Sequence, residues 1–197
     1  QGVRCVSLAG MLPALSGYGF GVLRLLAGNN QATPALTTGH ATTVVAVIQT
    51  IEAGLKATGR LLAGCTMAFV GLGSIGQAVL QVLLKTLPHP RSLILCDRPG
   101  QIPRLKALAQ SLAQDLGYQG TIRVMASEGK VPAAIYQAQV IVAATSSPEI
   151  IDVEQLQART IVIDDSFPAC LDTGVAIQRM QHAGDVLIVG GGAGRSP

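Results

Sequence analysis

From about residue 60 onward, short uninterrupted apolar runs alternate with segments in which apolar residues recur every three or four positions. A short apolar run bounded by turn residues is typical of a strand that is buried on both faces, whereas the wider spacing is typical of an amphipathic helix. Strand and helix therefore alternate, which predicts an α/β fold with a doubly wound, mostly parallel sheet. The strands are expected at residues 67–70, 92–96, 121–125, 140–144, 160–163 and 186–189.

A long helix is expected over residues 40–58, because apolar residues line one of its faces and Thr37 or Thr38 can cap its first turn. It precedes the first strand of the sheet, a position in which a long helix commonly links two domains. We therefore expect residues 1–38 to belong to a missing or neighbouring domain, and residues 39–197 to form one α/β domain. The other helices are expected at residues 75–87, 105–116, 132–137 and 174–183.

The N-terminal part of the chain carries weaker signals. Residues 3–8 fit a strand, and residues 29–38 are polar and rich in turn formers. Residues 5–23 carry no charge, and their length is close to the ~20 residues that span a bilayer. Because Pro13 and several glycines would make a poor spanning helix, we expect a buried or ligand-facing loop there and no membrane span.

Composition narrows the classes of partner. Charged residues make up only 13% of the chain and hydrophobic residues 49%, which favours a surface partly covered by further domains or by a second copy in a homo-oligomer. The net charge of +3 is scattered and aromatics are 3%, so no nucleic-acid partner is expected. The four cysteines form no C-x-x-C pair, which argues against a zinc site or a disulfide framework and favours a reducing cytoplasm. No metal site is expected.

Three closely spaced glycines follow the first expected strand and precede an amphipathic helix, in the pattern G-x-G-x-x-G. In a dinucleotide-binding turn, the first glycine makes the bend, the second lets the backbone approach a pyrophosphate, and the third lets the helix pack on the strand. The positive end of the helix then faces the phosphates. The pattern predicts a Rossmann domain. The residues expected to contact a dinucleotide are Gly71, Leu72, Gly73, Ser74, Ile75 and Gly76.

Asp97 ends the second expected strand, about 20 residues past the last glycine, where a dinucleotide fold places its ribose-binding acid. Its carboxylate would accept hydrogen bonds from the ribose hydroxyls of NAD and repel the 2′-phosphate of NADP. Arg98 beside it weakens this argument, since an arginine at that turn can pair with the same phosphate. The expected cofactor is NAD or NADP, with NAD favoured.

The turn after the fourth expected strand also faces the cofactor in this interpretation. Ligands of doubly wound sheets bind beyond the carboxyl ends of the strands, at the point where the strand order reverses. Ala144, Thr145 and Ser146 lie at such an end and are expected to contact the dinucleotide.

Three residues are candidates for contact with a substrate. Thr38 and His40 begin the long helix, where two domains would meet, and Asp165 follows the fifth expected strand. Each also fits a structural role, because a histidine in a first helical turn often caps or packs, and the paired carboxylates Asp164 and Asp165 fit a cap of the next turn. No residue order or cluster identifies a catalytic group.

Five segments, taken together and in order, resemble the cyanobacterial long-chain acyl-[acyl-carrier-protein] reductases. They are residues 6–19, 37–43, 70–76, 140–148 and 161–168. The resemblance implies a nicotinamide-dependent reduction of a fatty acyl thioester to an aldehyde, with an acyl carrier protein or acyl thioester as partner. That family has a longer glycine turn, an arginine-type ending to the second strand, and an acyl-accepting cysteine beyond the last strand. None of the four cysteines here matches that position, so no catalytic residue is carried over.

The long helix before a Rossmann core is also similar to amino-acid dehydrogenases and shikimate dehydrogenases. In those enzymes, the resemblance implies, a catalytic lysine and aspartate come from a domain that precedes the helix. A third interpretation is a dinucleotide-binding module with no chemistry of its own.

Overall fold

The computed structural model describes residues 3–8, 12, 16, 19–26 and 34–191. Contacts within the chain divide it into two compact units, Gln1–Thr43 and Val44–Pro197, and each is described by itself. The assignment of residues 1–38 to a separate domain remains a prediction.

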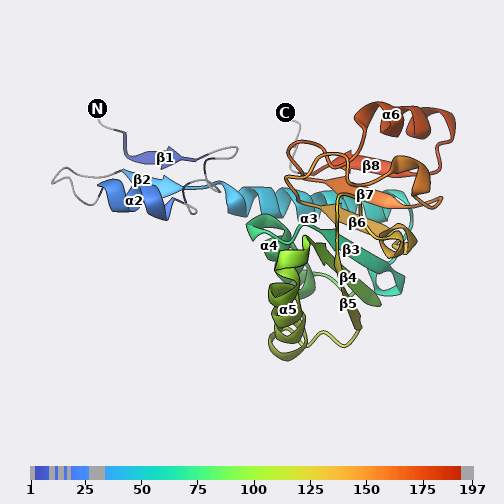
Figure 1. The fold of residues 1–197 in the computed structure, drawn as a ribbon, viewed down its shortest axis with the longest axis horizontal. Helices are drawn as coiled ribbons and strands as arrows, with labels where there is room; N and C mark the ends of the chain where they lie inside the picture. Colours follow the sequence, from blue (N-terminus) through green and yellow to red (C-terminus); the bar gives the residue numbers. More distant parts are fainter. Residues whose placement is uncertain (1–2, 9–11, 13–15, 17–18, 27–33, 192–197) are drawn as a thin grey trace. The chain divides into compact units, whose positions relative to one another are not determined.

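The Val44–Pro197 unit is built around a six-stranded sheet in the order β5-β4-β3-β6-β7-β8, in which every neighbouring pair is parallel (Figure 1). The order reverses between β3 and β6, so the sheet is doubly wound, as predicted. Each strand begins and ends within one residue of its predicted bounds. The strands are β3 (Thr66–Val70), β4 (Ser92–Asp97), β5 (Thr121–Ala126), β6 (Val140–Ala143), β7 (Ile161–Asp164) and β8 (Leu187–Gly190).

The central strands are continuously apolar because both faces of the sheet are covered. Side chains alternate between the two faces: Met67 and Phe69 join one buried cluster, and Ala68 and Val70 join the other. Together these clusters form the core that holds the carboxyl ends of β3, β6 and β7 in fixed positions.

Three helices pack on the first of these faces and a less regular layer packs on the second. The first layer contains α3 (His40–Ala57), α4 (Ser74–Thr86) and α5 (Ile102–Asp115). The second contains α6 (Thr173–His182) and the short 3-10 helices η3 (Ala133–Gln137) and η4 (Val153–Gln155). The helix predicted at residues 132–137 is therefore a 3-10 helix, a form that is common in short connecting segments.

The N-terminal unit corrects two expectations. Residues 29–38 were expected to lack regular structure, yet β2 (Ala35–Thr37) pairs in parallel with β1 (Cys5–Ser7). The loop expected within residues 5–23 instead contains β1 and the start of α2 (Phe20–Leu26), and no residue of α2 is buried. The strand predicted at residues 3–8 is present as β1, whereas β2 is short and α2 is exposed, and the sequence pattern did not reveal these two elements. Pro13 lies outside the described residues.

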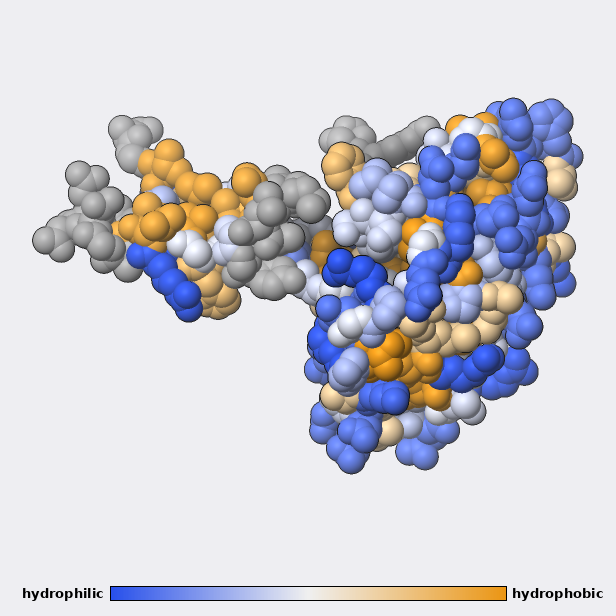
Figure 2. All heavy atoms as spheres, in the orientation of Figure 1, coloured by the Kyte–Doolittle hydropathy of each residue, from blue (hydrophilic) through white to orange (hydrophobic). Residues whose placement is uncertain are grey.

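Apolar side chains lie on the surface of the N-terminal unit (Figure 2). Phe20 is 66% exposed and Leu25 is 80% exposed. No helix in the described part of the chain is both long and apolar enough to cross a membrane.

Candidate functional site

The glycine-rich turn joins the carboxyl end of β3 to the first turn of α4. Gly71 has a φ of +82°, and a Cβ there would lie 2.5 Å from the carbonyl oxygen of Ala144. A Cβ at Gly76 would lie 2.1 Å from the carbonyl oxygen of Gly71. Both distances are far inside van der Waals contact, so the protein's own packing requires glycine at these two positions.

Gly73 differs from the other two glycines. Its φ is −63°, which any residue adopts, and a Cβ there would meet no protein atom within 4 Å. It is the N-cap of α4 and provides no side-chain hydrogen bond to the first turn. The fold therefore does not require glycine at position 73, and the open space beside it lies where the backbone N–H groups of the helix are exposed.

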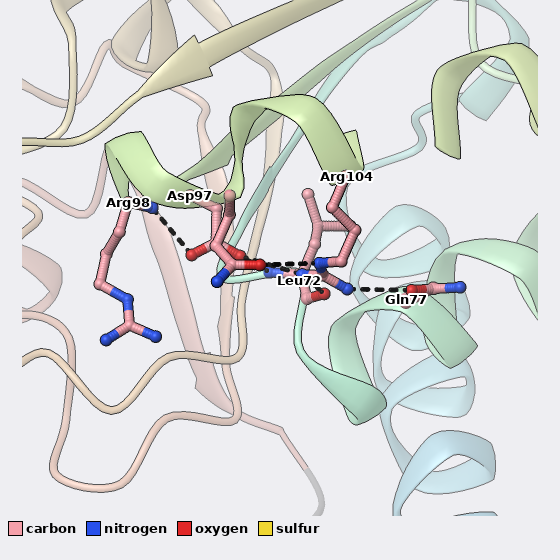
Figure 3. Close-up of polar contacts among 6 residues, drawn as sticks. Leu72, Gln77, Asp97, Arg98 and Arg104 are labelled. Carbon is pink, nitrogen blue, oxygen red and sulfur yellow. Dashed lines mark hydrogen bonds and ion pairs between the residues drawn. The ribbon is translucent and has the colours of Figure 1, made fainter. Parts of the chain in front are cut away.

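Asp97 and Arg104 hold the glycine-rich turn from both sides of Leu72 (Figure 3). The Leu72 N–H donates to Oδ2 of Asp97 at 3.0 Å, and Nη2 of Arg104 donates to the Leu72 carbonyl at 2.5 Å. Arg104 also donates to Gln77 of α4 at 3.1 Å and to Gln101 at 2.9 Å. Its Nη2 lies 3.5 Å from Oδ2 of Asp97. The turn, α4 and the start of α5 are thus tied together.

Arg104 and Gln77 were not predicted as site residues. Arg104 acts on a backbone atom 32 residues away, and in the sequence it looks like any exposed residue of an amphipathic helix. Only the carboxylate of this cluster had a recognisable spacing from the glycines.

We expect Arg104→Met to accelerate hydrogen exchange at the Leu72 amide by roughly fivefold, since losing a hydrogen bond of about 1 kcal/mol lets the turn open more often. Hydrogen exchange followed by mass spectrometry or NMR measures this. Lys106→Met is the matched control, because Lys106 is an exposed residue of the same helix and loses the same charge. Equal exchange rates in the two variants would show that Arg104 does not hold the turn.

A pocket of about 320 Å³ lies at the carboxyl ends of β3, β4 and β6. It brings together four of the residues predicted from sequence, Gly71, Asp97, Arg98 and Thr145. The guanidinium of Arg98 extends away from Asp97, although the Arg98 N–H donates to Oδ1 of Asp97 at 2.8 Å (Figure 3). The remaining lining residues, which sequence reasoning missed, are Val70, Ser127, Gly129, Ser147, Pro148 and Ile150.

The turn after β6 is fixed by hydrogen bonds to its neighbours. The Thr145 N–H donates to the hydroxyl of Ser166 at 3.1 Å, and the Ser147 N–H donates to the hydroxyl of Thr145 at 3.1 Å. Ala144 packs against Gly71, and Ser146 is exposed. The turn therefore borders the glycine-rich turn on the side away from Asp97.

The two carboxylates after β7 have different surroundings. Asp164 accepts hydrogen bonds from the N–H groups of Ser166 and Cys170, each at 3.0 Å. Within the described part of the chain, no donor reaches the carboxylate of Asp165. Burial, and then repulsion from Asp164, raise the pKa of Asp165 to about 6. Asp165 is therefore a half-buried acid that titrates near neutral pH.

Three of the four cysteines, Cys65, Cys96 and Cys170, are buried. Burial is the main cause that raises the pKa of Cys96 to about 12, and burial followed by the charge of Asp164 raises the pKa of Cys170. Such thiols stay protonated at neutral pH and are poor nucleophiles.

Thr38 and His40 lie at the start of α3, in the N-terminal unit. Their contact with a substrate remains a prediction, as do the cofactor contacts of the glycine-rich turn and the turn after β6.

The sheet order, the glycine-rich turn and the pocket beside it define the Val44–Pro197 unit as a Rossmann-like domain. No protein-family model matches the chain, and no curated protein matches it. Solved structures do match its fold.

Shikimate dehydrogenase in complex with NADP+ is 18% identical, with a TM-score of 0.54, over 82% of this chain and 53% of that chain. L-Tryptophan dehydrogenase from Nostoc punctiforme is 18% identical, with a TM-score of 0.54, over 78% of this chain and 42% of that chain. Quinate dehydrogenase from Corynebacterium glutamicum in complex with NAD is 23% identical, with a TM-score of 0.50, over 64% of this chain and 44% of that chain. The chain thus spans about half the length of these structures, and at such identities the likeness shows the fold alone.

Proposed function

We propose that the Val44–Pro197 unit binds NAD or NADP and serves a nicotinamide-dependent oxidoreductase. The observation that carries the proposal is the open space at Gly73 beside the N-terminus of α4, where neither a positive φ nor close packing requires glycine. A pyrophosphate that approaches the first turn of α4 supplies a reason for glycine. The NAD and NADP+ complexes of the quinate and shikimate dehydrogenases with this fold support the same conclusion.

In this proposal the backbone from Gly73 to Ile75 holds the pyrophosphate, because the Leu72 N–H already donates to Asp97, and the pocket beside Asp97 holds the adenosine. An ionised carboxylate has about four acceptor positions, and the N–H groups of Leu72 and Arg98 and the more distant Nη2 of Arg104 use three of them. Asp97 therefore retains about one acceptor position for a ribose hydroxyl. The nicotinamide half would lie on the other side of the glycine-rich turn, near Thr145 and Ser146. The cofactor would supply the hydride.

The preference between NAD and NADP is expected to depend on Asp97, and Asp97→Asn removes its charge together with one acceptor. Asparagine keeps a side-chain oxygen for the Leu72 N–H and loses the acceptor for the Arg98 N–H, whereas alanine would also release the turn. We expect Asp97→Asn to weaken NAD roughly 5- to 20-fold, because a neutral acceptor holds the ribose less tightly, and to leave NADP unchanged or bound more tightly. Isothermal titration calorimetry with both cofactors measures this.

Asp115→Asn, which changes an exposed acid of α5, is the matched control. Equal losses for NAD and NADP in Asp97→Asn would move the discrimination to Arg98, whose side chain lines the same pocket.

For the substrate, we propose a dehydrogenase that acts on a small amino or hydroxy acid. The named activities of the shikimate, quinate and tryptophan dehydrogenases with this fold favour it. The second candidate is reduction of a fatty acyl thioester delivered by an acyl carrier protein, which the ordered sequence resemblance favours. The exposed apolar residues Phe20 and Leu25 suit an acyl chain in that case. A dinucleotide-binding module without chemistry is the third.

The test uses the complete protein together with any sequence that flanks these residues. It is assayed for NAD(P)+ reduction with amino and hydroxy acids, and for NAD(P)H oxidation with a long-chain acyl thioester. Turnover of an amino or hydroxy acid alone supports the dehydrogenase function. Turnover of the acyl thioester alone supports the acyl reductase function instead. Cofactor binding without turnover in either assay supports a dinucleotide-binding module without chemistry.

A further inference from the structure

Within the described residues, the carboxylate of Asp165 at the sheet's carboxyl edge accepts no hydrogen bond from the fold itself. Both oxygens of its neighbour Asp164 accept backbone N–H groups, and those contacts organise the turn after β7. Asp165 is held in place by its backbone N–H, which donates to the carbonyl of Ala143 at 2.8 Å. It also packs closely against the end of β8, since a Cβ at Gly191 would lie 2.9 Å from its own Cβ.

The order of the strands places Asp165 relative to the proposed cofactor site. Ala143 pairs with Asp164 in the β6–β7 register, so the next residues, Ala144 and Asp165, directly follow the ends of neighbouring strands. Ala144 in turn packs against Gly71 and Gly76. The spatial order along the carboxyl edge of the sheet is therefore Asp97 at the end of β4, the glycine-rich turn after β3, Ala144 after β6 and Asp165 after β7.

A dinucleotide that has its adenosine beside Asp97 and its pyrophosphate at the glycine-rich turn extends its other half over β6 and β7. We propose that Asp165 is an electrostatic partner of the nicotinamide ring, which favours the cationic, oxidised ring over the neutral, reduced one. This inference rests on the proposed dinucleotide-binding function.

The charge of the Asp165 carboxyl changes between pH 5 and pH 7.5, a range in which cofactor binding can be measured. Burial first, and Asp164 second, raise its pKa to about 6, so the carboxylate is largely ionised at pH 7.5 and largely protonated at pH 5. A cation beside it stabilises the ionised form and lowers that pKa on binding. The affinity for the oxidised cofactor therefore rises with pH through this range, whereas the affinity for the reduced cofactor does not rise with it.

Among the described residues at the carboxyl ends of β6, β7 and β8, Asp164 is the charged neighbour of Asp165, whereas Asp97 and Arg98 lie at the carboxyl end of β4, beyond the glycine-rich turn. The turn after β6 presents Thr145 and Ser146, β8 ends at Gly190 and Gly191, and residues 44–50 of α3 contain no titratable side chain. The pH dependence is thus expected to follow Asp165, since both oxygens of Asp164 are engaged by backbone N–H groups.

The test measures dissociation constants for NAD+ and NADH, and for NADP+ and NADPH, between pH 5.5 and 8. We expect the ratio of the reduced to the oxidised dissociation constant to rise about threefold across this range, the part of a tenfold total coupling of one pKa unit that falls between pH 5.5 and 8. In Asp165→Asn the ratio should stay flat. Asp115→Asn, the exposed acid of α5, should behave like the unmodified chain.

A second measurement needs no variant. Calorimetry at pH 6 in buffers of different ionisation enthalpy reports the protons exchanged on binding, and the oxidised cofactor is expected to release a fraction of a proton while the reduced one releases none. If both forms bind with the same pH dependence and no differential proton release, the inference is wrong although the binding function stands. Absence of binding for every cofactor at every pH would overturn the proposed function itself.

Discussion

A Gly73→Val variant of the chain is expected to fold like the unmodified protein and to lose dinucleotide binding by more than about 100-fold. The side chain would enter space that no protein atom occupies within 4 Å, so we expect the free energy of unfolding to change by no more than about 1 kcal/mol. In the proposed complex, however, the pyrophosphate occupies the same space. The valine side chain would displace it, so several hydrogen bonds from the N-terminus of α4 to the charged pyrophosphate would lengthen together. Each is worth about 1.5–3 kcal/mol.

The contrast with the other glycines makes this result specific. Gly76→Ala should unfold readily, because its Cβ would lie 2.1 Å from the carbonyl oxygen of Gly71. Gly64→Ala is the neutral control, since Gly64 also has open space around it but lies before β3, at the opposite end of the strand. Denaturant unfolding and calorimetric titration with NAD and NADP separate the two effects. Unchanged binding in Gly73→Val, with the fold intact, would remove the observation on which the proposed function depends.

The second large effect concerns stability. Asp165→Asn is expected to stabilise the fold at pH 7.5 by roughly 1–2 kcal/mol, because the ionised carboxylate is disfavoured in the folded state and solvent screens part of this effect. The folded-state pKa of about 6 lies above the ordinary value of 3.8, so the folded protein binds more protons than the unfolded chain between these values. The stability contributed by this group is therefore greatest at low pH and is lost as the pH rises from about 4 to 6.

The measurement is urea unfolding of the unmodified chain and of Asp165→Asn at pH 4.5 and at pH 7.5. The advantage of the variant should be small at the lower pH and approach its full size at the higher one. A constant difference at both pH values would mean that the amide acts through packing rather than through the lost charge. Asp165→Asn can both stabilise the fold and remove the pH dependence of the ratio of the reduced to the oxidised dissociation constant. In that case, the same carboxylate destabilises the folded state and strengthens binding of the oxidised cofactor.

The sheet was predictable because buried parallel strands are continuous apolar runs, and helices at regular spacing separate them. The glycine-rich turn and Asp97 were predictable because their spacing along the chain is fixed by the ligand they are expected to hold. In the N-terminal unit only β1 was predicted, within residues 3–8, since β2 and α2 are short and largely exposed and their residues form no periodic pattern.

The pattern of glycines did not reveal which of them the protein requires for its own packing. That distinction depends on atoms brought close by the fold, such as the carbonyl of Ala144 beside Gly71. Arg104 was missed for the same kind of reason, because its contact with Leu72 joins two helices and a turn that are separate in the sequence.

Both backbone groups of Leu72 are already bonded within the protein, its N–H to Asp97 and its carbonyl to Arg104. The entropy lost in fixing this turn is therefore part of the free energy of folding and is not subtracted again when a ligand arrives. A preorganised turn of this kind recognises its ligand without induced fit. The diphosphate fragment alone then finds the same backbone geometry as the whole dinucleotide, and selectivity among dinucleotides is left to the groups on either side of the turn.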